Sequence, residues 1–72
     1  MLKLEVGQVF EFFKPVNVNG QSIAKGTRVR VGFIQQEALE DKVDIVVIGK
    51  EPSKTIQVPR SLLMVNSQLV KT

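Results

Sequence analysis

Hydrophobic and polar side chains alternate through residues 25–33, KGTRVRVGF. One phase of the alternation consists of Thr27, Val29, Val31 and Phe33, and the other consists of Arg28, Arg30 and Gly32. Successive side chains of a β-strand point to opposite faces of the sheet. The pattern therefore predicts a strand over 27–35 that turns an apolar face to the core and a basic face to solvent.

Four other segments have the composition of strands. These are a Val- and Phe-rich strand within Val6–Lys14, a β-branched interior strand over Lys42–Ile48, an alternating strand over Lys54–Val58 and a short final strand over Gln68–Lys71. We expect strands to cover at least half of the residues. The positions expected in the core are Phe10, Phe12, Val29, Val31, Phe33, Ile45, Val47, Ile56 and Val58.

Turn signals separate these strands. Asn19-Gly20 predicts a hairpin between residues 16–18 and 21–23, because a type I′ turn needs positive φ at both central residues. Gly26 marks a turn before the basic strand. Residues 36–41, QEALED, are too few for a stable helix and predict a polar loop or single turn. Residues 59–63 predict one 3₁₀-like turn before the last strand.

Five main strands in 72 residues predict a single all-β domain that closes into a small antiparallel barrel. The chain resembles the SH3-like barrel superfold at three places, namely Gly7-x-Val9, Gly26-Thr27-x-Val29 and Val58-Pro59-x-Ser61-Leu62. This resemblance implies a five-stranded barrel with a small hairpin excursion. A five-stranded OB-like barrel is the alternative, and the lack of a clear helix between the third and fourth strands weakens it.

The residue inventory argues against catalysis. The chain has no His and no Cys, so the common ligands of zinc, haem and iron–sulfur centres are missing, as are Ser–His and Cys–His nucleophile pairs. We interpret the acids near residues 37–44 as a solvated loop, because their spacing matches no EF-hand. Ile56-Gln57-Val58-Pro59 is similar to the active-site strand of type II dihydrofolate reductases, but the tyrosine of that segment is absent. We expect no enzyme activity, cofactor or metal.

Basic residues provide the most concrete functional hypothesis. The formal net charge is +3, which permits contact with nucleic acid without requiring it. Arg28 and Arg30 on one strand face lie about 7 Å apart, which is close to the spacing of phosphates along a nucleic-acid strand. The residues expected to bind the backbone weakly are Lys25, Arg28, Arg30, Lys54 and Arg60.

The alternative hypothesis is a protein-interaction module or an oligomeric subunit of a larger complex. Val9 and Phe13 share the second face of the first strand, and they would dock a protein partner or a second copy if that face is open. A proline-peptide groove is not expected, because the chain has no Trp and no Tyr. The sequence has no run of about 18 apolar residues and no signal-peptide pattern, so we expect a cytoplasmic protein without membrane contact.

Overall fold

A computed structural model describes residues 3–71 of the chain. Strands make up 49% of these residues, just below the expected half, so the fold is mostly β. The elements in chain order are β1 (Val9–Phe12), β2 (Val16–Val18), β3 (Gln21–Ile23), β4 (Arg28–Gln35), β5 (Lys42–Val47), β6 (Thr55–Pro59), α1 (Arg60–Asn66) and β7 (Ser67–Lys71).

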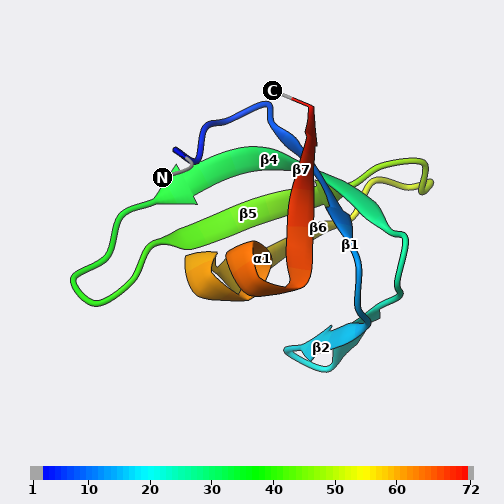
Figure 1. The fold of residues 1–72 in the computed structure, drawn as a ribbon, viewed down its shortest axis with the longest axis horizontal. Helices are drawn as coiled ribbons and strands as arrows, with labels where there is room; N and C mark the ends of the chain where they lie inside the picture. The colour runs from blue at the N-terminus through cyan, green and yellow to red at the C-terminus, as the bar shows by residue number, and fades with distance from the viewer. Residues whose placement is uncertain (1–2, 72) are drawn as a thin grey trace.

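Five strands form one antiparallel sheet in the order β6-β5-β4-β1-β7, and β2 pairs with β3 in a separate hairpin (Figure 1). The interior position predicted for residues 42–48 is confirmed, since β5 lies between β4 and β6. The two edge strands, β6 and β7, do not pair with each other in the described part of the chain. The sheet is therefore open, and the predicted closure of the strands into a barrel is wrong.

The predicted 3₁₀-like turn over residues 59–63 is also wrong, because the chain forms the α-helix α1 there. This helix contacts both edge strands, β6 and β7, and buries Leu63 completely in the core. Seven residues are too few for a stable isolated helix, so tertiary packing supplies the stability. At the end of the helix the Leu63 carbonyl accepts from both the backbone amide and the hydroxyl of Ser67.

The predicted hairpin is confirmed. Val16 pairs with Ile23 and Val18 with Gln21, which leaves Asn19 and Gly20 at the centre of a two-residue loop. Their φ angles are +51° and +77°, as a type I′ turn requires.

Ten apolar side chains form the core, and all but one of the predicted β-strand core positions belong to it or border it. The buried residues are Phe10, Phe12, Ile23, Val29, Val31, Val43, Ile45, Ile56, Val58 and Leu63. Val47 is half-buried and packs against them.

The burial predicted for Phe33 is wrong, because its side chain is 56% exposed. The cause is a β-bulge, since Val31 pairs with Ile45 whereas Phe33 pairs with Asp44, the next residue along β5. Gly32 is therefore the extra residue on β4, and it shifts the alternation by one position. Beyond the bulge Phe33 joins the outer face and Ile34 turns toward the core.

Candidate nucleic-acid interface

Arg28 and Arg30 lie on the outer face of the sheet, opposite the core. Both are exposed, and the buried Val29 between them points to the other side. Arg28 is paired across the ladder with Glu11 of β1, whereas Arg30 lies between Val9 and Val46 of the neighbouring strands. The two arginines therefore share one face, as the alternation predicts, but they have different neighbours.

The Arg28 guanidinium donates a hydrogen bond from Nε to Oε1 of Glu11 over 2.9 Å. The Arg28 side chain is 57% exposed and that of Glu11 is 32% exposed, so water screens the pair. No acidic partner within 4 Å of Arg30 occurs in residues 3–71. Arg30 is consequently the freer of the two cations for an external anion.

Two turns at the Arg28 end of β4 carry further cations. Lys25 is exposed in the turn between β3 and β4, and the amide of Ile48 donates to the Arg28 carbonyl where the chain leaves β5. A small cavity of about 150 Å³ between the two turns is lined by Lys50 and Lys54 together with Thr27 and other residues. We call Lys25, Arg28, Arg30, Lys50 and Lys54 the basic end.

Sequence reasoning missed Lys50, which belongs to this group. The Gly49-Lys50-Glu51-Pro52 turn follows a predicted strand, but only the β4–β5 register shows that it returns beside Arg28. The small antiparallel barrel predicted from the sequence implies antiparallel pairing of these two consecutive strands. The position of Lys50 could therefore be inferred from the order of the strands, but not from a sequence motif.

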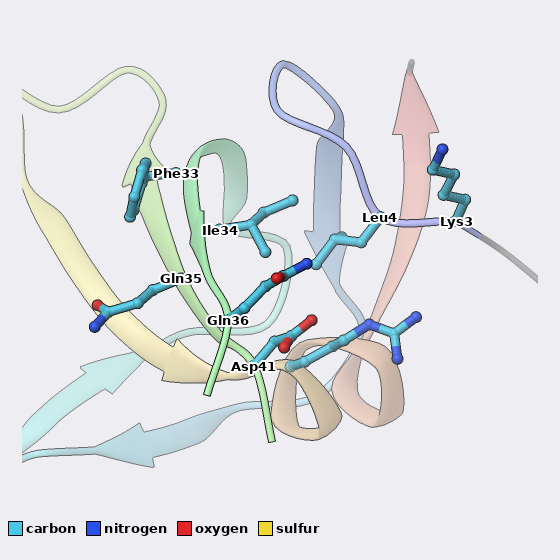
Figure 2. Close-up of a pocket in the computed structure, with 8 residues that line it drawn as sticks. Lys3, Leu4, Phe33, Ile34, Gln35, Gln36 and Asp41 are labelled. Atoms are coloured by element: carbon cyan, nitrogen blue, oxygen red, sulfur yellow. The ribbon is translucent and has the colours of Figure 1, made fainter. Parts of the chain in front are cut away.

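Arg60 does not join the basic end. It begins α1, and its backbone amide donates to the Asp41 carbonyl over 2.9 Å. Its side chain lines a groove of about 660 Å³ that also contains Lys3, Phe33 and Ile34 (Figure 2). The loop between β4 and β5 borders this region and carries three acids, Glu37, Glu40 and Asp41. Arg60 therefore lies near acidic side chains and apart from the basic end.

Val9 and Phe13 lie in the outward phase of the first strand. Val9 is half-buried and Phe13 is 43% exposed, with Lys14 Nζ 5.9 Å from the centre of its ring. Glu11 occupies the position between them, so the two apolar side chains do not form an unbroken patch along the strand.

The strand that is similar to the reductase segment has a simple structural explanation. Ile56 and Val58 are buried in the core, while Gln57 is exposed and donates to the Asp44 carboxylate over 3.3 Å. These are the positions expected of an ordinary strand with one buried face.

No helix within residues 3–71 is long and apolar enough to cross a membrane. The same residues contain no group of three or more acidic side chains arranged as metal ligands. In comparisons with protein families, curated proteins and solved structures, the chain matches none.

Proposed function

We propose that this chain is a small non-enzymatic module that contacts a nucleic-acid backbone through its basic end. One observation supports this function above the others. Five of the ten basic residues lie in two adjoining turns or in the first half of β4, where Glu11 pairs with Arg28 and Glu51 lies in one of the turns. The three acids of the β4–β5 loop lie at the tip of the β4–β5 hairpin, which is the end opposite to the basic end.

The fold that we propose for this module is an SH3-like barrel that remains open between β6 and β7. Its support is the sheet order, in which the last strand returns to pair with the first. The bulge at Gly32 bends the central strand, and α1 contacts both edges of the opening. A bent sheet with a helix across its opening encloses one core without full strand closure.

The chemistry of the basic end suits phosphates rather than bases. Arginine binds phosphate oxygens in a bidentate manner, and lysine acts as a point charge. Arg30 and the exposed Lys25 need no rearrangement to do so, whereas Arg28 must share its guanidinium with Glu11. Such contacts draw their free energy mainly from counterion release, so binding is sequence-independent and weakens steeply with salt.

Fluorescence anisotropy of labelled single- and double-stranded oligonucleotides, titrated at several salt concentrations, tests this function. Three phosphate contacts give a log–log salt slope of roughly −2 to −3. Arg28→Ala combined with Arg30→Ala should lower the affinity and flatten the slope, while the unfolding midpoint stays close to that of the parent. Lys50→Gln combined with Lys54→Gln should act in the same direction.

The matched control is Lys3→Gln combined with Arg60→Gln, which removes the same charge from the groove beyond the basic end. We expect the control to retain the parent slope. An equal loss in the control and the Lys50/Lys54 variant would show that net charge, rather than this end, causes binding. Absence of binding at high micromolar protein would contradict the function.

A protein partner or a second copy is the alternative function, and the outer face supports it. Phe33 and Ile48 are exposed there, and half-buried Val9 and Val46 flank Arg30. Arginine surrounded by apolar side chains is a common composition at the centre of interfaces. This alternative predicts no oligonucleotide binding and a mass that rises with protein concentration and falls with Phe13→Ser or Phe33→Ser.

A further inference from the structure

The second half of β4 has an unpaired edge. On the β1 side the ladder ends at Val9 and Arg30, and two further backbone bonds join Val31 to Gly7 and Gln8. Beyond Val31 the chain before β1 no longer follows β4. Residues 33–35 keep their pairing with β5, but on the opposite side no strand of residues 3–71 pairs with them.

A groove lies along this edge because the N-terminal segment bridges over it instead of pairing. The buried Gln8 side chain holds that segment, since its Oε1 accepts from the Glu5 amide over 2.8 Å and its Nε2 donates to the Lys3 carbonyl over 3.1 Å. Figure 2 shows Ile34 of β4 facing Leu4 across the groove. The groove therefore has the apolar side chains of Leu4 and Ile34 on facing sides and the unpaired edge of β4 along one side.

We infer that this edge docks a short extended segment of a partner protein, which adds to the sheet as a strand beside residues 33–35. A free strand edge presents amide donors and carbonyl acceptors at strand spacing, and another extended polypeptide matches them directly. Alternate side chains of the added segment would point toward Leu4 and Ile34, so apolar residues fit there. The inference does not depend on the nucleic-acid function, because it concerns a different surface.

Charge complementarity indicates an acidic residue in the docked segment. Arg60 and Lys3 line the groove with a single acid, Asp41, while Glu37 and Glu40 line an adjoining depression that Arg60 also borders. Arg60 is half-buried, and its side chain forms no ion pair with any described acid, Asp41 included. A carboxylate from the segment would give this guanidinium a bidentate partner.

The test uses ¹⁵N-labelled protein and three synthetic pentapeptides. They are Ac-Thr-Val-Thr-Glu-Thr-amide, whose valine and glutamate share one strand face, the same peptide with methylated backbone nitrogens, and Ac-Thr-Val-Thr-Lys-Thr-amide. We expect the acidic peptide to shift the amide signals of residues 33–36 and of Leu4 in a saturable manner. The methylated peptide should give no shifts, because it lacks donors for the strand edge, and the basic peptide should bind at least several-fold more weakly.

Two variants locate the contact. Arg60→Gln should weaken the acidic peptide at least several-fold and remove its advantage over the basic peptide, whereas Lys54→Gln, at the basic end, should leave its affinity unchanged. The unfolding midpoint of each variant shows that it remains folded.

Several results would overturn the inference. They are the absence of shifts at millimolar acidic peptide, shifts confined to the outer face around Arg30, and equal binding of the methylated peptide. If the signals of residues 33–36 shift with protein concentration before peptide is added, a second copy occupies the edge, and the proposed partner is wrong.

Discussion

The two halves of β4 bury opposite phases of one alternating pattern. Before Gly32, Val29 and Val31 are fully buried and the two arginines are exposed. After Gly32, Phe33 is exposed and Ile34 turns inward, although an uninterrupted alternation would place them the other way round. The first half is paired on both sides, whereas the second half is paired only with β5.

This difference comes from one extra residue. A bulge opposes two residues of one strand to one of its partner, so every side chain beyond it changes face relative to the uninterrupted pattern. The bulge also bends the strand, and the ladder with β1 ends at the same point. The exposure of the Phe33 side chain and the unpaired edge at residues 33–35 thus both begin at the bulge.

The strongest test of the difference between the two halves of β4 compares the stability of the variants Val31→Asp and Phe33→Gln. An aspartate at the buried position 31 has no partner, and burying it costs more than about 3 kcal/mol, a large share of the stability of so small a domain. We expect that variant to be unfolded at 25 °C in circular dichroism. Phe33→Gln removes a half-exposed ring and should cost less than about 1 kcal/mol in urea unfolding. Similar losses in both variants would place Phe33 in the core after all.

A comparison of the stability of Gly32→Val and Gly32→Ala tests the bulge itself. A Cβ at this position would lie 3.4 Å from Val46 Cγ2 and 3.5 Å from the Asp44 carbonyl, which is ordinary contact for one methyl group. The branched valine adds methyl groups to the same crowded space and should cost about 1–3 kcal/mol. Alanine should stay within about 0.5 kcal/mol of the parent. Urea unfolding measures both, and equal stability would show that Val46 gives way.

The sequence predicted the parts of the fold that depend on local pattern. The strand positions, the interior place of β5 and the Asn19-Gly20 turn follow from alternation, β-branched content and φ preference. The bulge was not predictable, because Gly32 fits a regular alternation equally well and only the pairing with Asp44 reveals the extra residue. The helix was missed for a similar reason, since its stability comes from burying Leu63 in the tertiary core.

The candidate site was predictable only in part. Arg28 and Arg30 share an exposed face because they are two residues apart in a strand, and that is local information. Lys50 was missing from the predicted residues, and Arg60 lines a different groove from Lys50 and Lys54, because their positions depend on which turns and ends the topology brings together. A list of basic residues therefore does not define a basic surface.

Gly20 differs from Gly32 because the turn needs its positive φ, whereas the space around it is open. Its φ is +77° and an added Cβ would meet nothing within 4 Å, whereas Gly32 does not have a positive φ. Gly20→Val should therefore cost about 1–2 kcal/mol, and Gly20→Asn clearly less, because asparagine tolerates positive φ. Urea unfolding of the two variants gives the difference. Equal stability would show that the turn relaxes into another conformation.

The smallest expected effect concerns the ion pair in the first half of β4. Glu11→Gln removes the partner of Arg28, and since both side chains are partly exposed, the stability should fall by less than about 1 kcal/mol. The same change frees the Arg28 guanidinium for phosphate, so oligonucleotide affinity at about 0.1 M salt should rise and the salt slope should steepen by up to about 0.9 for duplex DNA. Glu37→Gln makes the same change in net charge in the distant β4–β5 loop. Because charges farther apart than about 10 Å are largely screened at 0.1 M salt, this control should leave the slope unchanged. If Glu37→Gln increases binding as much as Glu11→Gln does, the first half of β4 has no special role in recognition.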